Sequence, residues 1–215
     1  MDDSLPDWVA PTDGEVVAAA DHIVAGRRPP TVDECVADIR FADEMMSLPD
    51  APLQFLYDFW LEKAGRDGGL SRREDFEMVA LLPAVGNIMI LDVEREGLDA
   101  RYRLYGTLIA RSAGKDWTGK TVSEMSAASK TNVALMYRAV YLAAYRTNRP
   151  LFTEHRSLPW LGARSWRRLM LPVTLTGTTC DQFIVGNVAV EGRDLSPQQM
   201  AQHRRILGED QSLAH

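Results

Sequence analysis

The side chains that most often perform chemistry are few in this chain and lie far apart. The four histidines are His22, His155, His203 and His215, and no two of them are three or four residues apart. A helical metal site needs that spacing, because only such residues share a face of the helix. Cys35 and Cys180 form no C-x-x-C pair and have no histidine at ligand spacing. The sequence therefore predicts two free thiols, and neither a zinc site nor a disulfide framework.

Catalytic motifs are also missing, and the one glycine-rich segment is not interpreted as a phosphate loop. The sequence contains no G-x-S-x-G, no H-E-x-x-H and no repeated carboxylate motif. Gly114-Lys-Asp-Trp-Thr-Gly119 is followed by Lys120 and Thr121, which is the spacing of a phosphate loop, but the segment follows a predicted helix over 107–112 instead of the strand that such a loop needs before it. No catalytic residue is predicted, and we expect the protein not to be an enzyme.

Aromatic and apolar side chains could instead line one small-molecule cavity. Such cavities are mostly apolar with a few placed polar groups, and tyrosine supplies both properties. The alternative is that the same side chains only fill the core. His155 would be either a hydrogen-bonding group of the cavity or an ordinary strand histidine. The lining candidates are Tyr102, Leu104, Leu108, Trp117, Tyr137, Tyr141, Trp166 and Met170.

Arg168 is the charged candidate for the same cavity. In an extended strand it shares a face with Trp166, whereas Arg167 lies on the opposite face. If Trp166 faces the cavity, Arg168 does so too, and a buried guanidinium needs an anionic ligand or a carboxylate partner. Either the ligand is acidic, or Arg168 pairs with Asp92 or Glu154.

Length and composition are those of an ordinary globular protein. With 215 residues, 46% of them hydrophobic and 25% charged, the chain suffices for one domain with extensions or for two small domains. Its net charge of −6 disfavours nucleic-acid binding, which usually needs a basic face. No run approaches the roughly 18 apolar residues of a transmembrane helix, and the acidic N-terminus does not resemble a secretion signal. We expect a cytoplasmic protein with no membrane or nucleic-acid partner.

The first third of the chain is predicted to be helical. Three S/T-x-x-E pairs have the spacing of a capping box, in which two side chains bind the unpaired N–H groups of a helix start. These pairs are Thr12 with Glu15, Thr31 with Glu34, and Ser71 with Glu74. Together with apolar spacing and proline or glycine breaks, they predict helices over 13–25, 32–46, 53–64 and 72–82.

After residue 87 the pattern changes to that of strands. Branched apolar runs and alternation of apolar with polar residues are typical of buried and half-buried strands. In order, we expect strands over 87–93 and 100–104, helices over 107–112 and 129–147, strands over 151–157, 165–173 and 182–190, and a last helix from Ser196.

The order of these elements, together with several short motifs, resembles a PAS domain. Arg103-Leu-Tyr-Gly-Thr107, followed by Gly114 to Gly119, is similar to the R-x-x-G-T and G-x-x-x-x-G motifs of a bacterial PAS-domain family. Phe59-Trp60 and Leu171-Pro172 match further positions of that family. The resemblance covers about residues 53–191. It implies an α+β fold, with a five-stranded antiparallel sheet, helices on one face, and N-terminal helices before it.

PAS domains are mainly sensory and interaction modules. The resemblance therefore implies a small-molecule cavity between the sheet and the long helix, and a surface for dimerisation or for a protein partner. The alternative is an interaction module whose cavity is filled by its own side chains. The implied ligand-binding residues are Tyr102, Leu104, Trp117, Tyr137, Tyr141, His155, Trp166 and Arg168.

The resemblance names no cofactor. Haem-binding PAS sensors ligate iron through a histidine on the long helix, and the segment 129–147 has none. Photosensors of the light-oxygen-voltage type need a cysteine in an N-C-R-F-L-like motif, where neither Cys35 nor Cys180 lies. We expect neither haem nor covalent flavin chemistry, while a non-covalent flavin stays open and the ligand stays unknown.

PAS modules often dimerise through helices that precede the sheet. Phe55, Leu56, Phe59 and Trp60 occupy more than one face of their helix, so some apolar surface should remain exposed and form a homodimer interface. The alternative is that the N-terminal helices cover the outer sheet face within one monomer. The expected divisions are an N-terminal helical extension over 1–52, a PAS-like domain over 53–192, and a C-terminal helix and tail over 193–215.

Overall fold

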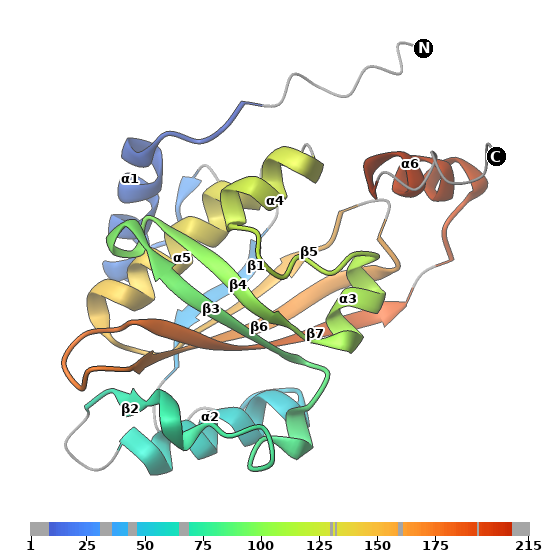
Figure 1. Ribbon diagram of the computed structural model, residues 1–215. Coiled ribbons are helices and arrows are strands. Elements are labelled where there is room, and N and C mark those ends of the chain that lie inside the picture. The colour runs from blue at the N-terminus through green and yellow to red at the C-terminus, as the bar shows by residue number, and fades with distance from the viewer. Residues whose placement is uncertain are drawn as a thin grey trace.

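In the computed structural model, one large sheet has helices on both of its faces (Figure 1). The structure describes residues 9–30, 36–42, 47–64, 69–129, 131, 133–158, 161–192 and 194–207. The sheet order is β1-β5-β6-β7-β3-β4, and every neighbouring pair in that order is antiparallel. A short strand, β2, pairs in parallel with β6. The strands are β1 (Val36–Phe41), β2 (Ser71–Arg72), β3 (Ile88–Glu94), β4 (Asp99–Tyr105), β5 (Leu151–Arg156), β6 (Ala163–Thr174) and β7 (Gln182–Gly192).

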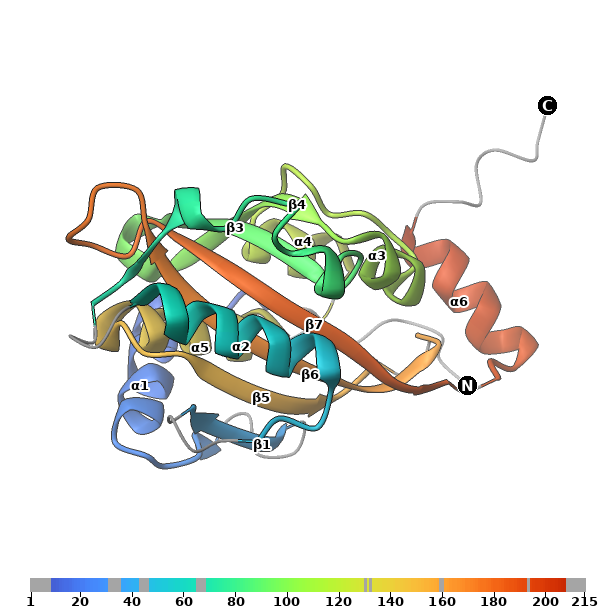
Figure 2. The same cartoon turned by 90° about the horizontal axis from the view of Figure 1, so that it is seen from below.

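The helices divide between the two faces of the sheet. The long helix α5 (Val133–Thr147) lies over one face and packs beside α1 (Asp13–Val24), with α3 (Thr107–Ala113) and α4 (Val122–Ser129) on the same side. The opposite face is covered by α2 (Ala51–Ala64), which Figure 2 shows crossing β6 and β7. The last helix, α6 (Pro197–Leu207), follows β7.

Each face of the sheet has its own apolar cluster. On the α5 face, the ring of Tyr141 packs on Phe183 at 5.1 Å between ring centroids. On the α2 face, a Cβ at Gly186 would lie 2.5 Å from Leu53 Cδ2 and 2.8 Å from Leu56 Cδ1. Glycine in the central strand β7 therefore lets α2 approach the sheet closely.

The structure confirms the expected α+β fold and its main elements. All five expected strands form, as β3 to β7, and α1 begins with the predicted capping box. In that box, Thr12 N donates to Glu15 Oε2 at 2.8 Å, and Glu15 N donates to Thr12 Oγ1 at 3.2 Å. Two features differ from expectation: β1 and β2 extend the sheet, and α2 lies on the face opposite the other helices, so that both faces are covered.

The expected helix over 32–46 is wrong, because residues 36–41 form the edge strand β1. This strand pairs with β5 from Val36 opposite His155 to Phe41 opposite Leu151. Ile39 and Phe41 pack against the apolar cluster of the α5 face. The apolar residues of this segment have helical spacing, but pairing with the edge of β5 stabilises a strand instead. The suggested cap of Thr31 and Glu34 lies outside the described residues.

The expected helix over 72–82 is also wrong. Its first residues form β2 and a 3₁₀ turn, η2 (Arg73–Asp75), and a second 3₁₀ turn, η3 (Leu82–Ala84), ends the segment. The Ser71 hydroxyl donates to the Trp60 carbonyl at 3.0 Å instead of capping a helix. This bond ties the end of α2 to β2.

The predicted long helix begins later than expected, and the sequence analysis missed the helix α4 before it. Thr121 N donates to Glu124 Oε2 at 2.7 Å, and Glu124 N donates to Thr121 Oγ1 at 3.1 Å. This is another capping box, and it starts α4 at Val122. The long helix itself begins at Val133.

The glycines of the two motifs have different roles. Gly114 and Gly119 have φ values of 73° and 86°, the left-handed region expected for turn glycines. Gly106 has a φ of −57°, and what matters there is space: a Cβ would lie 2.3 Å from the carbonyl oxygen of Gly86. The close approach of the two backbones at the end of β4, not a left-handed turn, explains this glycine.

Candidate functional site

A cavity of about 60 Å³ lies between the sheet and the helices of the α5 face. Strands β4, β6 and β7 form one wall, and α3, α4, α5 and the loop before α4 form the other. Buried side chains line its interior, whereas residues 156–158 and 161 at its rim are partly or fully exposed. The lining residues are Tyr102, Tyr105, Ala113, Trp117, Met125, Ser129, Val133, Tyr137, Arg156, Ser157, Leu158, Leu161, Trp166, Arg168 and Asn187.

A β-bulge decides which residues of β4 face the cavity. Leu91 of β3 pairs with Tyr102 and Ile90 pairs with Leu104, so Arg103 is an extra residue in β4. A bulge of this kind shifts the alternation of the side chains beyond it. Tyr102 and Tyr105 therefore lie on the same side, with ring centroids 5.2 Å apart, and Leu104 packs against the α2-side cluster.

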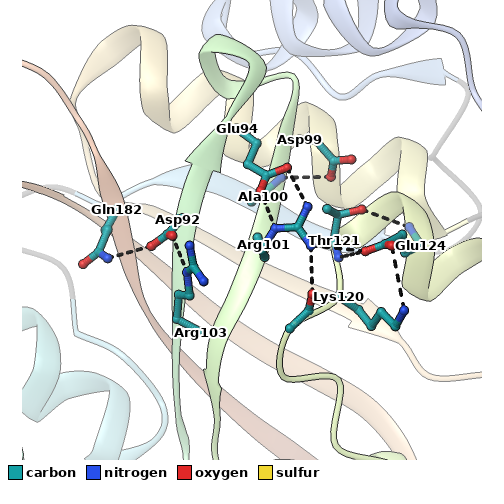
Figure 3. A network of polar contacts seen from close by, with 11 residues as sticks. Asp92, Glu94, Asp99, Ala100, Arg101, Arg103, Lys120, Thr121, Glu124 and Gln182 are labelled. Atoms are coloured by element: carbon teal, nitrogen blue, oxygen red, sulfur yellow. Dashed lines mark hydrogen bonds and ion pairs between the residues drawn. The ribbon is translucent and has the colours of Figure 1, made fainter.

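The wall opposite the sheet is fixed to β4 by backbone and side-chain bonds. Tyr102 N donates to the Lys120 carbonyl at 3.0 Å, and Gly119 N donates to the Tyr102 carbonyl at 2.7 Å. Arg101, at the centre of the network in Figure 3, binds Glu94 and also reaches the Gly119 carbonyl at 2.8 Å. These bonds hold the loop that carries Trp117 against the strand.

Arg168 is the buried charge of the cavity. Only 3% of the residue is exposed, and its guanidinium carbon lies 4.0 Å from the centre of the Tyr137 ring. Its Nε is 3.4 Å from Asn187 Oδ1, a long hydrogen bond between paired residues of β6 and β7. Its Nη1 is buried and makes no hydrogen bond of good geometry, although the guanidinium lies close enough to the Tyr141 hydroxyl to act against the rise in the pKa of that tyrosine.

The two carboxylates considered as partners for Arg168 are engaged elsewhere. Asp92 binds Arg103 and accepts from Gln182 Nε2 at 2.6 Å, as Figure 3 shows. Glu154 accepts from Arg167 Nε at 3.0 Å on the opposite face of the strand. Within the described part of the chain, no carboxylate pairs with Arg168, so pairing with Asp92 or Glu154 does not occur.

His155 belongs to the same buried polar group. Its Nε2 lies 2.9 Å from the Tyr137 hydroxyl, and its Nδ1 is buried without a partner. Burial, assisted by the Arg168 charge, lowers the pKa of His155 well below its ordinary value. The imidazole is therefore neutral at pH 7.

The tyrosines of the cavity are neutral as well. Burial raises the pKa of Tyr141 to about 12, although the nearby Arg168 charge acts against this shift. Burial also raises the pKa of Tyr102 and of Tyr105 above the ordinary value. At neutral pH these groups supply hydroxyl dipoles and no negative charge to balance the guanidinium.

The structure brings together five of the eight predicted ligand-binding residues: Tyr102, Trp117, Tyr137, Trp166 and Arg168 all line the cavity. Tyr102, Tyr137 and Trp166 line the same cavity between the sheet and the long helix. Their role in ligand binding stays a prediction.

The other candidates lie outside the lining. His155 stands behind Tyr137, and Tyr141 packs on Phe183 with its hydroxyl unpartnered. Leu104 lies on the opposite face of the sheet, because the bulge rotates it away. Leu108 is 47% exposed, and Met170 is buried in the core without lining the cavity.

Sequence analysis missed several lining residues, of which Tyr105 and Asn187 matter most. Nothing in the alternation of β4 reveals a bulge, so Tyr105 could not have been assigned to the cavity. Asn187 did leave a signal: it is a polar residue inside the apolar run Phe183–Val190. A buried polar side chain in a central strand requires a partner, and here that partner is Arg168.

The described residues hold no cluster of three or more histidine, cysteine or acidic side chains that could bind a metal ion. Cys180 is buried, and burial raises the pKa of its thiol to about 12, so it is a poor nucleophile. Cys35 lies outside the described residues. In the part of the chain that the structure covers, no helix is both long and apolar enough to span a membrane.

An antiparallel sheet with a long helix over one face, and a cavity between them, is the architecture that the sequence analysis expected of a PAS-like α+β domain. The PAS domain family matches the chain over residues 49–155, from just before α2 to the end of β5. This segment, 107 of the 215 residues, therefore has the sequence of a PAS domain. No curated protein and no solved structure matches the chain. Trp166, Arg168 and Asn187 lie beyond the matched region and complete the cavity.

Proposed function

We propose that the protein is a PAS-type sensory or regulatory module that binds a small organic ligand in the cavity beside α5. PAS domains are generally non-catalytic sensory modules. The observation that supports ligand binding is a buried polar atom without a hydrogen-bond partner on the cavity lining, Nη1 of Arg168. His155 Nδ1 and the Tyr141 hydroxyl are also buried without a partner, outside the lining. A buried polar atom without a partner costs free energy, which a bound ligand would recover. We assign no catalytic role to these residues.

The position of the cavity suggests how binding would be transmitted. Met125 and Ser129 of α4 and Val133 and Tyr137 of α5 contact the cavity, and so does the sheet. A ligand that binds one arrangement of α4 and α5 better than another shifts the population toward that arrangement. The signal would then pass to a protein partner or to a second copy of the chain.

A cavity-filling variant tests ligand binding. Ala113 lines the cavity from the end of α3 and is 8% exposed, so A113L places three more carbon atoms in the space. Native mass spectrometry of the purified wild-type protein should show a bound small molecule, or library screening should find one that raises Tm. A113L should lose this ligand and remain folded.

The matched control is A110L, at a half-buried position of the same helix outside the cavity. A110L should keep the ligand. Equal binding by wild type and A113L would contradict the location, and a wild-type protein that binds no compound would contradict ligand sensing.

A second candidate function is an interaction module that needs no ligand. It is supported by a group of exposed apolar residues in the segment 78–85, which comes before β3 and includes the 3₁₀ turn η3. These residues are Met78, Val79, Leu82 and Val85, and the exposed Leu108 lies close to this segment, at Gly86. Exposed apolar groups often mark interfaces. Light scattering at micromolar concentration tests self-association: a mass of two chains supports the expected homodimer, and a mass of one chain excludes it.

The N-terminal helices give less support to such a dimer than expected. Leu56 and Trp60 are buried on the α2 face, and Phe55 and Phe59 are half-buried against the same cluster. None of these four side chains is exposed, so the surplus apolar surface predicted for α2 is absent. The expectation of leftover surface there is wrong, because α2 covers a sheet face within the monomer.

A further inference from the structure

We propose that the ligand is a small carboxylate, bound through its carboxylate group by Arg168. This inference rests on the proposed function and specifies the ligand class. The residue that carries it is a guanidinium that the fold buries inside a cavity and leaves without a negative partner.

The lining of the cavity carries positive charge and therefore favours an anionic ligand. Its lining contains two guanidinium groups, Arg156 at the rim and Arg168 in the interior, and no aspartate or glutamate among the described residues. Burying an ionised group without an opposite charge is unfavourable. Burial raises the pKa of Tyr102 and of Tyr105 and lowers that of His155, so these side chains are neutral at pH 7 and do not supply that charge.

The contacts that Arg168 already makes leave room for a carboxylate. The Tyr137 ring stacks on the guanidinium, and Asn187 Oδ1 accepts from Nε. Stacking covers a face of the planar group and leaves its edge, with the N–H donors, accessible. A carboxylate accepts from that edge in the plane, and its oxygens would satisfy Nη1.

The size and the remaining lining restrict the ligand further. A cavity of about 60 Å³ holds roughly four to six waters, which corresponds to a ligand of about four to six non-hydrogen atoms. Apart from Arg168, the buried side chains around this space include Trp117, Met125 and Trp166. An ion with one carboxylate and a short apolar tail fits this combination, whereas phosphate lacks an apolar part.

Titrations of the full chain with matched acids and amides test the proposal. The probes are acetate, propionate and butyrate, against acetamide, propionamide and butyramide, at constant ionic strength and at concentrations into the millimolar range, because ligands of this size bind weakly. At least one carboxylate should raise Tm in a saturable way and give a binding isotherm. The amides, chloride and phosphate should bind at least tenfold more weakly.

Substitution at position 168 locates the binding. R168M keeps an unbranched side chain, shorter than that of arginine, and removes the charge, so it should reduce carboxylate affinity at least tenfold. Its Tm without ligand should equal or exceed that of wild type, because replacing an unpaired buried charge by an apolar group relieves its desolvation cost. The matched control is R167M, whose side chain lies on the other face of β6 and binds Glu154. It should bind the carboxylate as wild type does.

A readout without substitution covers the case in which R168M does not fold. The Nε–H resonance of Arg168 in the wild-type protein should shift on addition of the carboxylate and not on addition of its amide. Carboxylate binding that persists in R168M, or an unshifted Nε–H resonance at saturation, overturns the proposal. Equal affinity for acid and amide overturns the ligand class but leaves the proposed function standing, whereas a protein that binds no organic probe and carries no bound molecule contradicts both.

Discussion

Most buried polar side-chain atoms of the described residues have a hydrogen-bond partner, and most of the exceptions lie at or near the cavity. Trp60 Nε1 donates to the Pro172 carbonyl at 2.8 Å, deep on the α2 face. In the part of the chain that the structure describes, five buried side-chain atoms have no partner, and three of them belong instead to Tyr141, His155 and Arg168. Each such atom costs roughly 1–3 kcal/mol. This region therefore lowers the stability of the free protein, which is typical of a site prepared for a ligand.

The neutral state of His155 makes stability depend on pH. The pKa of His155 is lowered in the folded protein, chiefly by burial and also by the Arg168 charge. Near pH 6.5 this histidine therefore binds a proton in the unfolded chain and stays unprotonated in the folded protein. The free energy of unfolding should fall as the pH drops below 6.5, by up to about 1.4 kcal/mol per pH unit from this group. Urea unfolding between pH 5 and pH 8 measures the slope.

The variant H155Q should flatten this dependence, because glutamine can still bind the Tyr137 hydroxyl but does not titrate. H22Q, at a half-buried position of α1, is the matched control and should retain the slope. If H155Q loses as much stability between pH 7 and pH 5 as wild type does, the buried neutral histidine is not the cause.

At the residue scale, sequence analysis identified side-chain chemistry better than side-chain direction. Alternation placed Arg168 and Trp166 on one face of a strand, and both line the cavity. The same rule failed for Leu104, because the bulge at Arg103 depends on pairing with β3 and leaves no local signature. Pairing of Arg168 with Asp92 or Glu154 was equally undecidable, since it depends on which strands are neighbours.

Among the elements, α2 and β7 depend most directly on one missing side chain. A Cβ added at Gly186 would lie 2.5 Å from Leu53 Cδ2 and 2.8 Å from Leu56 Cδ1, which is shorter than a van der Waals contact. G186A should therefore push α2 from the sheet or force unfavourable rotamers, at a cost of about 1–3 kcal/mol in the free energy of unfolding. Thermal and urea unfolding measure this loss.

G192A, in the same strand, is the control, because a Cβ there meets no atom within 4 Å. It should change the stability by a few tenths of a kcal/mol at most. A G186A protein as stable as G192A would mean that α2 adjusts freely and that its packing on β7 is loose.

The elements that sequence analysis found, and those that it missed, differ in how local their causes are. The strands β3 and β4 and the helix α2 follow from apolar patterns within a few residues. β1 was mistaken for a helix because its stability comes from β5, which is remote in the sequence. The missed helix α4 was detectable, since Thr121 and Glu124 have the same capping-box spacing that located α1 correctly.

At the scale of the whole molecule, the N-terminal segment packs as a part of the fold. Val16, Ala19, Ala20 and Ile23 of α1 are buried in the cluster that includes α5, and β1 completes the sheet beyond β5. The apolar residues of this segment are therefore buried within the monomer. A dimer, if light scattering finds one, would have to use a surface other than these buried faces.

One polar link between α1 and the rest of the molecule is the ion pair of Asp13 and the buried Arg138. Arg138 lies on α5 with a side chain 4% exposed, and it also donates to the Leu98 carbonyl at 2.6 Å and the Pro11 carbonyl at 3.2 Å. Asp13 binds Arg95 as well. One carboxylate thus joins α1, α5 and the turn between β3 and β4.

Removing the charge of Asp13 should lower the free energy of unfolding. D13N leaves the buried guanidinium of Arg138 without its carboxylate, and we expect a loss of about 1–2 kcal/mol in urea unfolding at pH 7 with an unchanged m-value. Because the Arg138 hydrogen bond lowers the pKa of Asp13, its contribution is present above the ordinary value of 3.8 and is lost as the pH falls through the lowered pKa. The difference between D13N and wild type should therefore close at low pH.

The matched control is D21N on the same helix, whose pair with Arg146 is exposed at 64% and 37% of the two side chains. Exposed pairs add little to stability, so D21N should be indistinguishable from wild type. If D13N also had the same free energy of unfolding as wild type, apolar contacts alone would hold α1 on α5. The helix could then detach at low cost, and the N-terminal segment would again be available for contact with a second chain.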